Sequence, residues 1–430
     1  MTDASPDARP FGLWTASALV VGSMIGAGIF VLPAQLAPYG WTGVVGWLVA
    51  IGGALAMGQT MSRLSAAMPQ ASGTLAVCAE VMGPLPGVLL GWSYWIGVWG
   101  ANAIIALTGA AYLARVVPVL GASPLATALT AVALLWALTL LNLAGARAAG
   151  GFQLVATALK LLPLLAVLVI LARLGATGSL ALGRPSPIVP GSIAPATTLA
   201  FYALVGFESA NVVAARVRNP EVNLGRATMV GAGLTGLLYL LVCTGMACAL
   251  PPATLARSTA PIADFVAMFW GGWAGLGVAV FAAIACIGAL NGWVLVQGDV
   301  PLGLARAGVL PRWVGRTSAR DVPVPMLLVS TMLASLTVLS RASGSTAGLL
   351  TFLLQLTSAS TLWLYAGACV AALMRRIARR AAALGLAFAG WALWGSGLEA
   401  LGWSIVLLLT AIPLYWWARR AGAGVAPAIA

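Results

Sequence analysis

The sequence predicts an all-α polytopic membrane protein with 12 transmembrane helices. Hydrophobic residues make up 61% of the 430 residues and charged residues only 7%, whereas a soluble protein carries roughly a quarter charged residues. The apolar segments are continuous runs of about 20 residues, the length that a transmembrane helix needs, and lack the alternation of a β-barrel. No separate soluble domain fits this hydrophobicity, so residues 1–430 are expected to form one transmembrane domain.

Apolar segments follow one another along the chain, separated by short connections with Gly, Pro, Ser and Arg. The 12 helices are predicted at Phe11–Leu32, Gly40–Met61, Gly87–Leu113, Pro124–Leu143, Phe152–Leu171, Ala194–Ala215, Ala227–Leu250, Gly272–Val296, Val324–Leu339, Leu349–Met374, Ala382–Gly397 and Leu401–Trp417. The polar start Met1–Arg9 lacks a small-residue cleavage pattern, so no cleavable signal is expected.

The basic residues predict the orientation. With the N-terminus in the cytoplasm and the segments alternating, 16 of the 22 Lys and Arg residues lie inside and five outside, with Lys160 within the fifth segment. An odd number of helices would destroy this asymmetry, which is the positive-inside pattern of membrane proteins. We therefore expect a multi-pass protein of the inner membrane with both termini cytoplasmic. The formal charge of +13 then requires no nucleic-acid partner.

Two of the segments contain features that interrupt a helix. The first carries Gly22, Gly26 and Gly28 within seven residues, and the sixth carries Gly206 and Glu208 within Phe201–Ser209. Each glycine in a helix interior costs about 1 kcal/mol. Close helix packing through the glycines is the alternative interpretation of the first segment. An acidic residue within a membrane segment favours a functional site, because such residues are costly in lipid.

The spacing of the two breaks predicts a repeat. They lie five helices apart, and because five is odd the second is inverted relative to the first. This is the arrangement of a five-plus-five inverted repeat, with repeat one at about 11–173, repeat two at about 194–374, and two further helices at about 382–417. Broken helices expose N–H groups suited to a carboxylate and carbonyls suited to an ammonium. The α-groups of an amino acid match that pair of ends.

These residues also carry a family resemblance, which spans nearly the whole chain. The chain resembles the amino acid–polyamine–organocation superfamily, and most closely its bacterial basic amino acid/polyamine antiporters. The resemblance rests on Gly22–Phe30, Tyr94–Asn102, Gly206–Ala210, Asn219–Asn223, Ala260–Asp264 and Gly288–Trp293. It implies a LeuT-type fold that works by alternating access.

The resemblance also implies roles for individual residues. The backbone at Ala27 and Gly28 would bind the substrate carboxylate, and the carbonyls of Met24, Tyr202 and Val205 its α-ammonium. Trp293 would pack on the substrate side chain, and Tyr202 would form an extracellular gate. Glu208 would be a proton-sensitive coupling residue. The distal pocket would be lined by Gly97, Val98, Asn102 and Ile105.

Three positions depart from the arginine/agmatine antiporters of this family. Those have a serine where Ala27 stands, a tryptophan where Tyr202 stands, and no lysine that matches Lys160. In other branches of the superfamily, a lysine in the fifth helix stands in for a sodium ion and bridges that helix to the first. The alternative for Lys160 is a lysine whose ammonium reaches the membrane interface.

The sequence favours a secondary-active amino acid transporter, either an exchanger or a proton-linked permease, with a cationic amino acid/polyamine antiporter as the narrower alternative. A membrane enzyme is a remote alternative, since the chain has no histidine and no clustered acids for metal-dependent chemistry. A channel would need a filter segment or a ring of charges. No metal and no cofactor are expected, and the five cysteines are interpreted as packing residues. The expected partners are a small amino acid or amine substrate and the lipid bilayer, with a homodimer left open.

Overall fold

The computed structural model describes residues 11–68, 73–144, 159–180, 185–209, 217–340 and 346–420. Within these ranges the chain is helical, and its one strand-like pairing is an isolated bridge between Phe11 and Val217. All five cysteines are buried and free, which agrees with their interpretation as packing residues. The predicted all-α class is therefore confirmed for the part of the chain that is described.

The helices follow the predicted order. The first half comprises α1 (Leu13–Met24), α2 (Gly28–Leu36), α3 (Trp41–Ala67), α4 (Thr74–Met82), α5 (Pro84–Val116), α6 (Pro124–Leu143) and α8 (Leu161–Ala176). The second half comprises α9 (Ile193–Leu204), α11 (Pro220–Ala249), α12 (Pro252–Arg257), α13 (Pro261–Trp270), α14 (Gly272–Arg306), α15 (Val324–Ser340), α16 (Thr346–Met374), α17 (Arg379–Gly395), α18 (Gly397–Leu409) and α19 (Ala411–Arg420). Short 3-10 turns lie at Ala37–Tyr39, Pro118–Gly121 and Pro190–Ser192.

Several of these helices can cross a membrane. By length and apolar composition, seven spans lie within the described ranges, or eight if the bent pair α1–α2 forms one span. Three shorter apolar helices, α8, α13 and α15, accompany them. The chain is thus a polytopic helical membrane protein, and the count of twelve spans stays a prediction.

Some predicted boundaries differ from the structure. The predicted last helix is divided into α18 and α19 at Thr410, and α4 and α13 were not predicted. These last two have only 9 and 10 residues, too few for a membrane span, so the hydropathy pattern gave no separate signal for them. The predicted residues 152–158 and 210–215 lie outside the described part of the chain.

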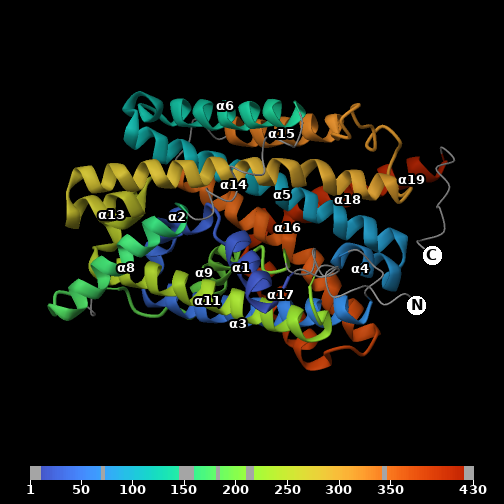
Figure 1. Ribbon diagram of the computed structural model, residues 1–430, viewed down its shortest axis with the longest axis horizontal. Coiled ribbons are helices and arrows are strands. Elements are labelled where there is room, and N and C mark those ends of the chain that lie inside the picture. Colours follow the sequence, from blue (N-terminus) through green and yellow to red (C-terminus); the bar gives the residue numbers. More distant parts are fainter. Residues whose placement is uncertain are drawn as a thin grey trace.

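The helices form a bundle whose centre holds the interrupted elements. Figure 1 shows α14 and α5 running beside each other across the molecule, with α6 and α15 on one side and α3 and α11 on the other. Helices α1, α9 and α16 lie between these layers (Figure 1). α5 is buried along most of its length, whereas α6 and the α18–α19 pair are largely exposed, as expected of helices that face lipid.

The first predicted helix is broken where its glycines predicted a break. α1 ends at Met24, α2 begins at Gly28, and the axes of the two pieces differ by 54°. At the break Ile25 takes a ψ of 85°, which no helix allows. The Gly26 N–H donates to the Met24 carbonyl across 2.8 Å, which closes the turn locally.

Candidate functional site

The end of α9 forms a second interruption that faces the first. α9 ends at Leu204, Val205 takes a ψ of 136°, and Gly206 a φ of +111°, a region that glycine alone enters readily. A Cβ at Gly206 would lie 3.2 Å from the carbonyl of Ser23 at the end of α1. The turn after α9 and the end of α1 therefore pack backbone against backbone, which only a glycine permits.

A cavity of about 40 Å³ lies where these breaks meet. A water needs about 10–15 Å³ measured in this way, so the cavity holds about three. Its lining comes from the α1–α2 break, α5, the end of α9, α14 and α16: Ser23, Met24, Gly26, Ala27, Gly28, Tyr94, Gly97, Val98, Ala101, Ile105, Tyr202, Ala203, Val205, Trp293, Thr357 and Thr361. None of these described lining residues is charged. A solute with one net charge would therefore find no counter-charge here. A zwitterion is neutral overall, and the helix ends can bind its two charged groups.

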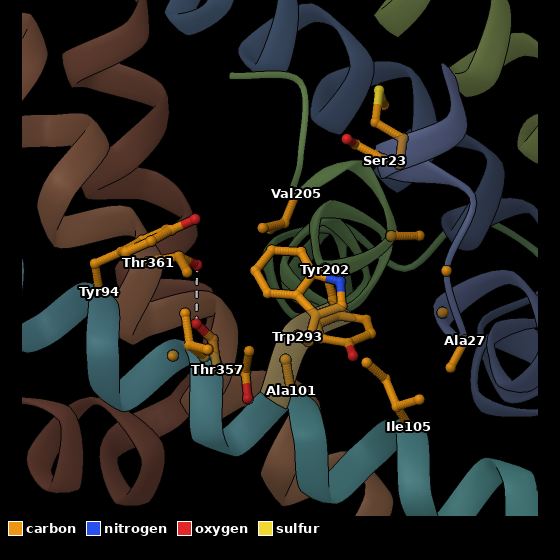
Figure 2. A pocket seen from close by; sticks show the side chains of 16 residues that line it. Ser23, Ala27, Tyr94, Ala101, Ile105, Tyr202, Val205, Trp293, Thr357 and Thr361 are labelled. Carbon is orange, nitrogen blue, oxygen red and sulfur yellow. Dashed lines mark hydrogen bonds between the residues drawn. The ribbon is translucent and has the colours of Figure 1, made fainter. Parts of the chain in front are cut away.

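Trp293 of α14 is the largest side chain in this lining. Figure 2 shows its indole in the middle of the view, with Ala101 and Ile105 of α5 below it and Tyr202 close by. Ala27 lies on one side of the ring, and Tyr94, Thr357 and Thr361 lie on the other (Figure 2). The indole therefore separates the broken-helix end of the cavity from its hydroxyl-lined end.

The broken helices present backbone groups to the cavity. Ala27 is the N-cap of α2 and gives no side-chain hydrogen bond, so the first N–H groups of α2 lack the usual cap. On the α1 side, the Met24 carbonyl accepts from the Tyr239 hydroxyl at 2.9 Å and from the Gly26 N–H at 2.8 Å. Both lone pairs of that carbonyl are therefore engaged. The family resemblance implied that the same carbonyl would bind the substrate ammonium.

Nine of the ten predicted substrate-binding residues line this one cavity. They come from four segments far apart in the sequence: Met24, Ala27, Gly28, Gly97, Val98, Ile105, Tyr202, Val205 and Trp293. The tenth, Asn102, does not line it in this structure, and its role at the substrate stays a prediction. Its amide is fully buried and donates to Gln297 Oε1 at 2.7 Å and to the Trp293 carbonyl at 3.3 Å, so it points into the wall behind the cavity.

Glu208 lies just beyond the turn at Gly206 and is buried. Its carboxylate accepts from the Gly206 N–H at 3.0 Å and from the Tyr94 hydroxyl at 3.3 Å. The Tyr365 hydroxyl lies close to it without a well-formed hydrogen bond. Tyr94 also lines the cavity, so its hydroxyl connects the Glu208 carboxylate with the cavity.

Lys160 lies apart from the cavity. It is the N-cap residue of α8 and is 3% exposed, so its ammonium is buried. Among the described residues it makes no hydrogen bond to α1, and the bridge that the resemblance implied is not formed in this conformation. Its burial argues against an ammonium that reaches the interface.

Sequence reasoning assigned no site role to several of the lining residues. Ser23 and Tyr94 lie within motifs that carried the resemblance, but Thr357 and Thr361 of α16 lie in none of them. The two threonines are four residues apart, so they lie on one face of an apolar helix. This spacing is the sequence feature from which they could have been predicted. The Thr361 hydroxyl donates to the Thr357 carbonyl at 2.9 Å, whereas the buried Thr357 hydroxyl has no described partner.

The described residues contain no group of three His, Cys, Asp or Glu side chains that could hold a metal ion. Around the cavity lie the uncapped start of α2, the carbonyl end of α9 and the aromatic face of Trp293. Helix ends of this kind can bind a carboxylate or an ammonium by hydrogen bonding.

Comparisons with known proteins identify the family and several relatives of the chain. A family model described as amino acid permease matches residues 11–421. The chain is 29% identical over 348 residues to the cadaverine/lysine antiporter of Escherichia coli (strain K12), covering 79% of this chain and 77% of that protein. It is 27% identical over 366 residues to the putative arginine/ornithine antiporter of Bacillus subtilis (strain 168), covering 77% of each.

Proposed function

We propose, from the premise that this chain belongs to the amino acid permease family, that it moves its substrate by alternating access around the central cavity. The family and the relatives are transporters, so the chain is a transporter of amino acids or related amines and not an enzyme. The observation that carries the mechanism is the meeting of two interrupted helices at one cavity. A cavity of about 40 Å³ is too small for an amino acid with its side chain, so it must widen to admit one.

We further propose the finer architecture. The break in α1–α2 and the end of α9 are corresponding elements of a five-plus-five inverted repeat, followed by α17 and α18–α19 as the appended pair. Twelve spans with both termini in the cytoplasm of the inner membrane account for the distribution of the basic residues. A homodimer is compatible with this arrangement.

The proposed substrate position follows from the lining. The N–H groups at Ala27 and Gly28 receive the carboxylate at the positive end of the α2 dipole. The carbonyls of Tyr202 and Val205 receive the ammonium, while that of Met24 requires a rearrangement first because Tyr239 and Gly26 already occupy it. The substrate side chain then lies on Trp293.

The identity of the side chain is less constrained by the site. The hydroxyl-lined end has no described carboxylate for a second cation, so a guanidinium or alkyl ammonium would rely on the Trp293 face. Neutral amino acids fit the same lining. An amino acid exchanger or proton-linked permease is therefore the main proposal. Antiport of cationic amino acids or polyamines is the second, and it is favoured by the relatives named as cadaverine/lysine and arginine/ornithine antiporters.

We assign the coupling of conformational change to transport to two buried groups, Glu208 and Lys160. Glu208 accepts a hydrogen bond from the turn after α9 and another from Tyr94 of the cavity, so a change in its charge would reach both. Lys160 is a buried cation on α8 that would contact α1 in another conformation of the cycle. Neither proposal requires a metal ion.

Transport by purified protein tests this function. The protein is reconstituted into proteoliposomes, and uptake of labelled alanine, leucine, lysine, arginine and cadaverine is followed. Uptake is compared between vesicles preloaded with an amino acid and empty vesicles. It is also compared with and without a pH gradient. Acceleration by internal substrate identifies an exchanger, and acceleration by the pH gradient identifies a proton-linked permease. Monodisperse protein that transports no member of a full panel of amino acids and polyamines would contradict the proposal.

A further inference from the structure

A chain of buried polar side chains runs behind the cavity wall that carries Trp293. Asn102 donates to Gln297 Oε1 at 2.7 Å and to the Trp293 carbonyl at 3.3 Å. The Gln297 amide donates to Thr331 Oγ1 at 3.0 Å, and that hydroxyl pairs with Thr139 Oγ1 at 2.8 Å. The four polar side chains are all 0% exposed. They join α5, α14, α15 and α6 through one line of hydrogen bonds.

Gln297 occupies the centre of this chain. It lies four residues after Trp293, which places it on the same face of α14 one turn further along. Its Oε1 and Nε2 are both used, one towards α5 and one towards α15. An apolar side chain would fill the same buried space without any polar group to satisfy. Two well-formed hydrogen bonds to two helices therefore indicate that the amide fixes α14 at a defined rotation and depth.

Asn102 connects this fixed point to the cavity. It lies on α5 between Val98 and Ile105, which both line the cavity, yet its own amide turns to Gln297 and to the Trp293 carbonyl. A shift of Gln297 would release Asn102, and the hydrogen bond that ties the Trp293 carbonyl to α5 would be lost with it. The indole stands between the two ends of the cavity, so its position decides how much room a substrate side chain has (Figure 2).

We propose that Gln297 is a positioning residue that acts through Asn102 to hold the Trp293 indole, and that it thereby sets the length of substrate side chain that the site accepts. The proposal rests on the cavity being the substrate site, as proposed above. Gln297 itself does not line the cavity, so its effect on selectivity is indirect.

The proposal distinguishes a positioning role from a merely structural one. Loss of a structural contact lowers the amount of active transporter and reduces transport of every substrate equally. Loss of a positioning contact raises KM for substrates that reach Trp293 and leaves short substrates almost unchanged. The ratio of KM for arginine or leucine to KM for alanine is therefore the readout, because it does not depend on the amount of folded protein.

Two variants at position 297 separate shape from hydrogen bonding. Gln297→Met keeps the length of the side chain and removes both hydrogen bonds. We expect it to raise the KM ratio by about threefold to twentyfold, the range spanned by buried side-chain hydrogen bonds in membrane proteins. Gln297→Glu in its protonated form keeps an acceptor for Asn102 and a donor for Thr331, and we expect it to recover the wild-type ratio at acidic pH.

Matched threonine variants provide the control. Thr331→Val removes the hydroxyl that holds Gln297, and we expect a smaller rise of the same ratio. Thr108→Val removes an equally buried hydroxyl of α5 that donates only to its own helix, at the Ile104 carbonyl, and no change is expected. In a Trp293→Ala background, Gln297→Met should add no further change to the ratio, because both act on the same contact.

The outcomes separate this inference from the proposed function. Wild-type protein that transports none of the probes overturns both. Wild-type transport with an unchanged KM ratio in Gln297→Met, or with equal losses for alanine, leucine and arginine, overturns the positioning role alone. A raised ratio that persists undiminished in the Trp293→Ala background shows that Gln297 acts elsewhere, and this also overturns it.

Discussion

Gly28, at the start of α2, packs directly against Tyr202, at the end of α9. A Cβ built on Gly28 would lie 3.2 Å from Cδ1 of Tyr202 and 3.1 Å from Cα of Ala203. The uncapped start of α2 thus touches the end of α9. Gly28, Tyr202 and Ala203 all line the same small cavity.

Gly28→Ala should weaken substrate binding. The new methyl group would force α2 and α9 apart by a few tenths of an ångström, and the carboxylate and ammonium positions would separate with them. Overpacking of a tight contact costs about 1–3 kcal/mol, so we expect affinity to fall by about tenfold. The measurement is the dissociation constant of a transported amino acid, obtained by calorimetry in detergent.

Gly52→Ala is the control for that substitution. Gly52 lies within α3, and its new Cβ would have no atom within 4 Å apart from its own helix. Its affinity should equal that of the wild type. Equal affinities for both alanine variants would show that the contact between α2 and α9 does not shape the site.

Gly206→Ala should disable transport beyond its effect on stability. The φ of +111° strains any L-residue by about 1–3 kcal/mol, and the methyl group would also lie 3.2 Å from the Ser23 carbonyl. Gly271→Ala imposes similar strain at a φ of +91° with no atom within 4 Å. Both should lower the thermal unfolding temperature. Transport per folded molecule should fall only in Gly206→Ala, and a parallel fall in Gly271→Ala would refute a specific role for the contact with α1.

The sequence allowed both helix breaks to be predicted, for a physical reason. Three glycines within seven residues weaken a helix in any context, and Glu208 is a cost that a simple membrane helix would not carry. The bends themselves depend on packing between helices. Nothing in the local sequence predicts the direction of the 54° bend between α1 and α2. The short helix α13 escaped prediction because its 10 residues cannot span a bilayer.

The lining of the cavity could be predicted in part, and the exception is instructive. The family resemblance placed both Ile105 and Asn102 in the distal pocket, yet the Asn102 side chain turns to Gln297. Its direction is decided by Gln297, a residue 195 positions further along the chain, with which no local pattern connects it. Thr357 likewise reaches the cavity only because α16 packs against α5.

Glu208→Gln should flatten the pH dependence of transport. The amide can still accept from the Gly206 N–H, so the turn after α9 should persist, but the group no longer ionises. Initial rates are measured across acidic and neutral pH. Glu80→Gln replaces an exposed carboxylate on α4 and should leave the profile unchanged. A wild-type pH profile in Glu208→Gln would exclude this carboxylate as the coupling group.

Thr357→Val should lower affinity for a substrate whose side chain forms hydrogen bonds. The buried Thr357 hydroxyl lines the cavity and has no described partner, whereas valine keeps the same shape. One hydrogen bond contributes about 0.5–1.5 kcal/mol, so a loss of about twofold to tenfold in affinity is expected. Thr361→Val is the matched variant, since that hydroxyl already donates to the Thr357 and Ser358 carbonyls. Equal effects at the two positions would argue against a ligand role for Thr357.

Lys160→Met should abolish transport while the protein still folds. The methionine keeps the length and most of the volume of the buried stem and removes the ammonium, so packing of α8 against α13 and α14 should survive. A buried cation without a described hydrogen bond is costly, and we expect that cost to be offset in another conformation of the cycle, where the ammonium binds the end of α1. The measurement is the initial rate per monodisperse molecule, compared with expression level. Arg173→Gln removes an exposed charge from the same helix and should leave the rate unchanged. If Lys160→Met transports at the wild-type rate, its ammonium has no part in the cycle, and the lysine is a packing residue alone.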